Sequence, residues 1–278
     1  MLKNLIKHEF RATARILVPL FGVALVLSSL SWLVVRLGGI LVLPGGTGLG
    51  SPIFGVVAGI LVLITVFALF ALMVSAAIIT IQRFYKNLLG DEGYLMFTLP
   101  VTPGQHILTK LVAGLAWSAA ALVFVWSAFI AMATAIPGGL TLSQLMAIID
   151  RTFEIPAGVL FTRTLPLFLI GASNSYLLAY LSMAIGSQRQ GSRLFASFAA
   201  YAVLNIILMI LSIVGIFLLA CVISMLGLAP KLVRLINSLS AVQVLDLTLG
   251  VLTCVFLIGD AVYFFLTRAI LTRRLNLA

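Results

Sequence analysis

The side chains that could carry chemistry are few in this sequence, and most of them stand alone. Its 278 residues include seven acids and two histidines, and the histidines, His8 and His106, are isolated from each other. Acid–base catalysis and metal binding need several such groups at defined spacing. We therefore expect no catalytic centre, no metal site and no cofactor within this chain.

Asp260 and Asn174 are the two polar residues of interest, because each lies inside a long apolar run. An acid within a membrane helix is costly and is a candidate functional site by default. Asp260 could form an ion pair with a cation at the inner membrane end, such as Arg193 or Lys110, and this is the interpretation that we favour. It could instead bind a cationic substrate or carry protons. For Asn174, a hydrogen bond between helices is a more common role than a substrate contact.

The elements that must position these residues are membrane helices. The chain is 63% hydrophobic and 9% charged, whereas a soluble domain has about 25% charged residues. Six apolar runs are long enough to cross a bilayer. The runs are Ile16–Val35, Pro52–Ile81, Leu111–Ile136, Leu165–Gly186, Leu194–Leu228 and Leu247–Thr267. We expect an all-α, polytopic membrane protein with six transmembrane helices, forming a single domain over residues 1–278.

Two segments differ from a simple crossing. Leu194–Leu228 is too long for one crossing, so we expect a spanning helix followed by a short re-entrant dip or interfacial turn before Pro230. Residues 1–15 predict an amphipathic helix, because apolar residues from Leu2 to Phe10 recur at helical spacing. Such a helix would lie on the membrane surface with its apolar side down, although a plain topology signal is the alternative.

Basic residues predict the orientation of the chain. The net charge is +10, and the basic residues lie at the ends of apolar runs, where they set topology and meet anionic lipid rather than nucleic acid. One side carries 12 of them and the other side five. The 12 are Lys3, Lys7, Arg11, Arg15, Arg83, Lys86, Lys110, Arg189, Arg193, Arg268, Arg273 and Arg274. We expect this side, with both termini and residues 83–110, to be cytoplasmic.

Two glycine patterns favour structural roles over nucleotide binding. Gly55 and Gly59 form a small-xxx-small pair, which permits close helix approach either within the chain or in a dimer. The segment Leu43–Pro52 is rich in glycine but has no lysine after its glycines, so it does not match a phosphate-binding Walker loop. We expect no ATP site in this chain.

The stretch between the second and third apolar runs is long and mixed in composition. Gly90 can end the second helix in a left-handed conformation, and Asp91 can cap a short helix over Glu92–Thr98. The sequence TPGQ, which begins at Thr102, matches a capping box with proline at the first helical position. The stretch therefore predicts a helix extension, a short separate helix, a turn and the next membrane helix.

The short helix in this stretch needs a surface to pack on, because a helix of this length does not persist alone in water. Aromatic residues and Met at its centre, with charges at the rim, are typical of an interface. The residues concerned are Lys86, Asp91, Glu92, Tyr94, Leu95, Met96 and Phe97. Docking on a partner protein and burial among lipid headgroups are both consistent with this pattern.

In this stretch the sequence resembles bacterial ABC-2 type permeases, the membrane subunits of ABC exporters. The likeness is carried by FYKNLLGDEGYLMFTLPVTPGQHILTKL, which is Phe84–Leu111. The opening MLKNLIKHEFRAT resembles the first helix of the family, and ILTRRLNL (Ile270–Leu277) resembles its basic ending. The resemblance thus includes both ends of the chain and its main inner loop.

The resemblance implies the fold of a type V ABC exporter, with six helices, an N-terminal interfacial helix and a re-entrant region before the last helix. The inner loop, residues 83–110, would carry a coupling helix that docks on a separate ATP-binding subunit. That subunit, and not this chain, would bind MgATP. Two permeases would assemble with two ATPases in the bacterial inner membrane, as a homodimer or with a sister permease.

The implied function is the export of an amphipathic substrate, such as a peptide, a drug or antibiotic, or a lipid. Two alternatives belong to other classes of protein. An ion-coupled secondary transporter usually shows more intramembrane carboxylates or interrupted helices in matched halves. A non-transporting membrane anchor or sensor for an ATPase is the other alternative. The sequence does not identify the substrate.

Overall fold

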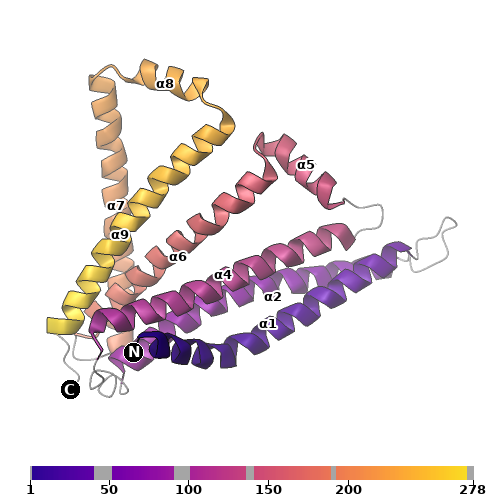
Figure 1. Cartoon of the computed structure of the whole chain (residues 1–278), viewed down its shortest axis with the longest axis horizontal. Coiled ribbons are helices and arrows are strands. Elements are labelled where there is room, and N and C mark those ends of the chain that lie inside the picture. Colours follow the sequence, from indigo (N-terminus) through magenta and orange to yellow (C-terminus); the bar gives the residue numbers. More distant parts are fainter. Residues whose placement is uncertain (1, 41–51, 91–100, 136–140, 189–191, 274–278) are drawn as a thin grey trace. The chain divides into compact units, whose positions relative to one another are not determined.

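The computed structural model describes residues 2–40, 52–90, 101–135, 141–188 and 192–273, and the regular elements within these ranges are all helices (Figure 1). Its elements are α1 (Leu2–Ile40), α2 (Pro52–Phe84), the π-helical turn η1 (Tyr85–Leu89), α4 (Pro103–Ala135), α5 (Leu142–Phe153), α6 (Ala157–Gly186), α7 (Arg193–Met225), α8 (Ala229–Ser238) and α9 (Ala241–Arg273). Six helices, α1, α2, α4, α6, α7 and α9, are long and apolar enough to cross a membrane, which confirms the expected number. The chain therefore has the helices of a multi-pass membrane protein.

The helices form two compact units. The first unit comprises Met1–Thr80 and Thr109–Leu165, and the second comprises Ile81–Leu108 and Pro166–Ala278. Three helices, α2, α4 and α6, begin in one unit and end in the other, so the units are joined by continuous helices.

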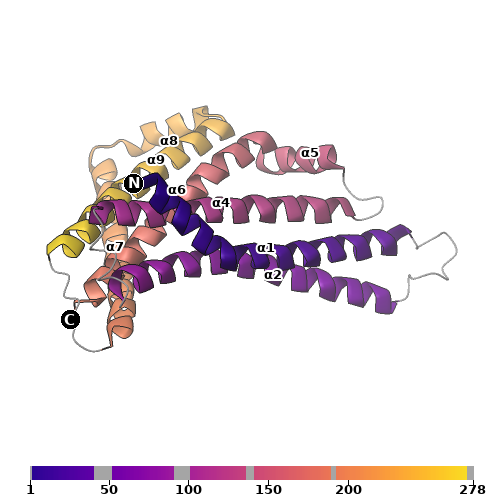
Figure 2. The same ribbon diagram turned by 60° about the horizontal axis from the view of Figure 1, so that its bottom comes forward.

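The first unit is built on α1, α2 and α4, which lie side by side in both views (Figures 1 and 2). Small and large apolar residues alternate in their shared core, which lets the helices approach closely. The buried residues of this core are Ala24, Leu69, Leu72, Ala121, Val125 and Ala128. The hydroxyl oxygens of Ser31 and Thr65, 2.5 Å apart, add a hydrogen bond between α1 and α2.

The expected N-terminal amphipathic segment is not a separate helix, because α1 runs unbroken from Leu2 to Ile40. Figure 2 shows that α1 is bent, with its first part set at an angle to the rest. Pro19 lies inside α1, and a proline there removes the hydrogen bond to the carbonyl four residues earlier, that of Arg15. The boundary expected at residue 15 is thus a bend and not a break. Placement of this segment on the membrane surface stays a prediction.

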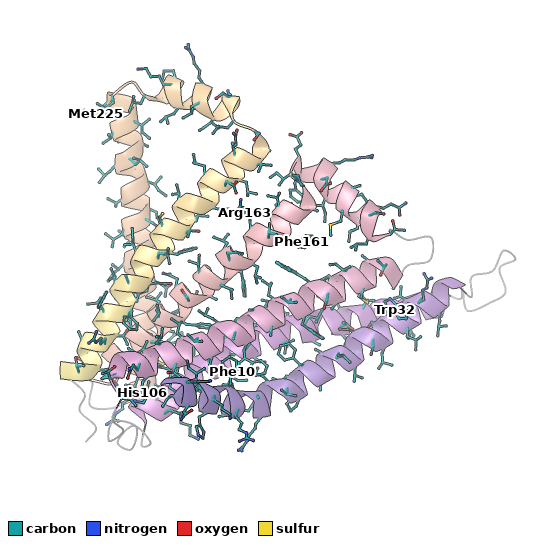
Figure 3. All side chains as sticks on the ribbon, viewed as in Figure 1. Phe10, Trp32, His106, Phe161, Arg163 and Met225 are labelled. Carbon is teal, nitrogen blue, oxygen red and sulfur yellow. The ribbon has the colours of Figure 1, made fainter. Side chains whose placement is uncertain are left out.

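The second unit contains α7, α8 and α9, and α8 joins the far ends of the other two (Figure 1). The length of the run Leu194–Leu228 predicts a spanning helix that breaks before its end. In the structure α7 is a single unbroken helix up to Met225, which Figure 3 labels. The sequence of α7 contains no proline, so no residue within it forces the helix to break. The expected turn before Pro230 is present and includes Gly227 at a φ of +61°. A re-entrant role for α8 stays a prediction.

Candidate functional site

The inner loop is the first candidate site, and its middle lies outside the described residues. Of the residues expected to dock, Asp91, Glu92, Tyr94, Leu95, Met96 and Phe97 fall in that part, while Lys86 lies in η1. The coupling helix therefore stays a prediction. The two flanks of the loop, however, are described, and each is held against helices of the second unit.

The leading flank ends in a backbone geometry that differs from the one expected. Gly90 does follow the last helical residue, and its N–H donates to the carbonyl of Tyr85 at 3.0 Å. The expected left-handed conformation is wrong, because Gly90 is extended, with φ −89° and ψ −171°. The wider π turn of η1 closes the helix without a left-handed residue. Glycine is still required, since a Cβ there would lie 2.7 Å from the carbonyl oxygen of Lys86.

The leading flank is held to α6 by an aromatic stack. The rings of Phe84 and Tyr180 lie 3.9 Å apart between centroids and are inclined by only 10°. Both side chains are fully buried, as is Leu88. Rings in such offset stacks contribute dispersion energy and restrict movement. The end of α2 is thus fixed before the chain enters the inner loop.

The trailing flank begins with one of the two hydrogen bonds of the capping box that the sequence predicts. The backbone N–H of Thr102 donates to Oε1 of Gln105 at 3.1 Å, and α4 starts at Pro103. His106 and Ile107 follow and are buried. A Cβ at Gly104 would lie 3.5 Å from the side chain of Arg268, so α9 packs closely on this turn. The described residues on both flanks of the loop are therefore packed against helices of the second unit.

A buried ion pair in the first unit joins α1 to α4. Nζ of Lys110 lies 3.3 Å from both carboxylate oxygens of Glu9, and the two side chains are 5% and 11% exposed. Nearby, Nε1 of Trp117 donates to Oγ1 of Thr13 at 2.8 Å, and the indole also contacts Phe10, which Figure 3 labels. We did not expect this network from the sequence. The available signal was that Glu9 is the only acid before residue 91.

The second candidate site is a polar cluster between α6 and α9. The hydroxyl of Ser173 donates to one oxygen of the Asp260 carboxylate. Nδ2 of Asn174 donates to the other oxygen at 3.1 Å and to the carbonyl of Phe256 at 3.2 Å. The structure thus brings together Asp260 and Asn174, which the sequence presented as separate candidates.

The favoured ion pair of Asp260 with an inner-end cation is not found in the described part of the chain. The partners of its carboxylate there are the two neutral donors of α6, and Lys110 is engaged by Glu9. The physical reason is helix register, because Asn174 and Asp260 face each other across a contact that glycine makes possible. The role expected for Asn174, a hydrogen bond between helices, agrees with this geometry.

Gly259 provides a test of this cluster. A Cβ at Gly259 would lie 2.7 Å from Nδ2 of Asn174, which is closer than real Cβ contacts. We expect Gly259→Ala to displace the amide from Asp260 and to destabilise the fold by about 1–3 kcal/mol. At Gly250, on the same helix, an added Cβ meets no described atom within 4 Å, so Gly250→Ala should be neutral or slightly stabilising. Thermal unfolding in detergent measures both, and equal midpoints would contradict the contact.

The glycine pair of α2 has no packing partner among the described residues. A Cβ at Gly55 or at Gly59 would meet no atom of the described chain within 4 Å. Packing within the chain, one of the two roles expected for this pair, is therefore not found there. The other role, a contact in a dimer, stays a prediction.

Comparison of the chain with protein-family models gave no match, and comparison with curated proteins and with solved structures gave no significant similarity.

Proposed function

We propose that this chain is the membrane permease subunit of an ATP-driven exporter of the ABC-2 type. It would lie in a bacterial inner membrane with both termini in the cytoplasm. A separate ATP-binding subunit would bind MgATP and dock on the inner loop. A second permease, either identical or a sister chain, would complete the passage for an amphipathic peptide, drug or lipid.

The observation that carries this proposal is the burial of both flanks of the inner loop. A loop that only connects two membrane helices needs no stacked aromatic pair at one end and no buried turn at the other. A loop that receives force from a partner does need fixed ends, because a loose connection would absorb the movement. Phe84 against Tyr180, and Ile107 within α4, supply such ends. The resemblance of this loop to those of ABC-2 permeases supports the same conclusion.

The connectivity of α4 suggests how force on the loop would reach the rest of the chain. This helix starts in the second unit and continues through the first, where Lys110 and Trp117 bind residues of α1. ATP can shift the permease only by binding one state of the assembly more tightly than the other. In this proposal the ATP-bound partner subunits close, pull the inner loop and α4 together, and change the permease from inward-open to outward-open.

The competing functions differ in their energy source, which gives the test. We would co-express the chain with a candidate ABC-type ATP-binding protein from the same organism, purify the pair and measure uptake of a fluorescent amphipathic dye into inside-out vesicles. An exporter subunit co-purifies with the ATPase and transports the dye only with ATP. Uptake driven by a proton or sodium gradient without the ATPase would instead show a secondary transporter. Co-purification without any transport would show an anchor or sensor.

A further inference from the structure

The Asp260 cluster holds a carboxylate within a membrane helix without a positive charge beside it in the described structure. Its two hydrogen-bond donors, Ser173 and Asn174, are neutral. In the sequence, α6 carries no charged residue after Arg163. The nearest basic residue on α9 is Arg268, eight residues further on, which places it about 12 Å away along the helix axis. A charge in this position is expensive unless an ion or ligand compensates it.

The hydrogen-bonding pattern of the cluster favours an organic cation over a metal ion. A carboxylate can accept about four hydrogen bonds, and Ser173 and Asn174 occupy two of those positions. Both neighbours direct hydrogens toward the carboxylate, so they fix its orientation but do not present oxygen atoms to a shared ion. A metal ion needs a shell of several oxygen ligands. An ammonium or guanidinium group needs only acceptor positions, which are the positions that remain.

The surroundings of Asp260 on α9 are suited to the apolar part of such a ligand. Asp260 is half-buried and is therefore partly exposed at the surface of α9. Leu257, one turn before it, is 52% exposed, and Phe264, one turn after it, is partly exposed. Residues at these spacings share one face of a helix. The face therefore combines one held carboxylate with apolar surface on both sides.

We propose that Asp260, held in place by Ser173 and Asn174, binds the ammonium or guanidinium group of a cationic amphipathic substrate. The proposal rests on the proposed export function and narrows its substrate class from amphipathic molecules in general to those with a positive charge. The apolar part of the substrate would lie along α9 beside Leu257 and Phe264.

The test compares two probes that differ in one charge. Dansylcadaverine carries a free ammonium group, and N-acetylated dansylcadaverine does not. Binding of each to the purified chain in phosphatidylcholine nanodiscs is followed by fluorescence, without ATP and without any partner subunit. We expect the charged probe to bind wild-type protein at least about tenfold more tightly than the neutral probe, the gain typical of a hydrogen bond to a charged group. Asp260→Asn should remove this preference, so that this variant binds the two probes with similar affinity.

Matched variants distinguish binding at Asp260 from a general effect of charge on probe binding and from a loss of folding. Asp246→Asn changes an exposed acid on the same helix and should keep the preference. Asp260→Glu keeps the negative charge and should therefore still bind the charged probe more tightly than the neutral one. Thermal unfolding of each variant shows whether Asp260→Asn is folded; if it is not, Asp260→Glu carries the test. A preference that survives in folded Asp260→Asn would overturn the proposal. The proposal would also be overturned if sodium chloride abolished binding of the charged probe and equimolar choline chloride did not. The site would then hold an inorganic cation. Because ATP is absent, failure of the export proposal leaves this result intact.

Discussion

Alanine at both Tyr94 and Phe97 is expected to abolish stimulation of the partner ATPase by this chain while leaving the chain folded. The two residues are three positions apart, so in a helix they lie on the same face. Aromatic anchors at an interface lose about 2 kcal/mol or more each on truncation. Two such losses lower the affinity of the chain for the ATP-binding subunit about a thousandfold. Because the two proteins then no longer associate, the ATPase hydrolyses ATP at its unstimulated rate.

A matched aromatic substitution controls for general effects of losing a ring. Phe153 on α5 is 58% exposed and outside the inner loop, so Phe153→Ala should leave both co-purification and ATP hydrolysis unchanged. Thermal unfolding of the double variant should match that of wild type. A double variant that binds and stimulates the ATPase as well as Phe153→Ala does would show that the inner loop does not dock through these residues.

Replacing Lys110 by Met is expected to give the largest loss of stability among single substitutions at the described polar contacts. The change removes the ammonium group that pairs with the Glu9 carboxylate, and the Glu9 side chain is only 11% exposed. Removing one member of a buried ion pair costs about 3–5 kcal/mol, because the remaining charge is uncompensated. The same change at Lys7, which is exposed on α1, should alter stability by less than about 0.5 kcal/mol.

The double variant Glu9→Gln with Lys110→Met completes a thermodynamic cycle for this pair. Removing both charges should restore most of the stability lost in the single variant, since no uncompensated charge is left. Unfolding free energies of the four proteins are measured in the same detergent. A double variant as unstable as Lys110→Met would mean that packing around Lys110, rather than its charge, holds α1 to α4.

The sequence predicts the number of membrane helices well but not where they end. Apolar runs of 20 or more residues leave few other interpretations, and the described part of the chain has six helices long and apolar enough to span a membrane. The helices extend beyond these runs because backbone hydrogen bonding continues through polar residues. For example, α9 begins at Ala241 and includes Asp246, whereas the apolar run begins at Leu247.

In the candidate sites, contacts between residues close together in the sequence could be predicted, whereas contacts between distant residues could not. The cap at Thr102 was predictable because its partner, Gln105, is three residues away. The conformation of Gly90 was not, because it depends on the π turn that precedes it. The partners of Asp260 are 86 and 87 residues away in the chain, and Glu9 and Lys110 are 101 apart. Such pairs are set by the register of one helix on another, which composition and spacing do not specify.

The central claim is tested most directly by measuring ATP hydrolysis by the purified pair, which is this chain in lipid nanodiscs together with a candidate ABC-type ATP-binding protein from the same organism. We predict that the two proteins purify in equal amounts and that the ATPase in the complex is faster than the ATP-binding protein alone. Vanadate, which traps ABC ATPases after hydrolysis, should inhibit it. An ATP-binding protein that neither binds the chain nor changes its rate in the chain's presence would contradict the account.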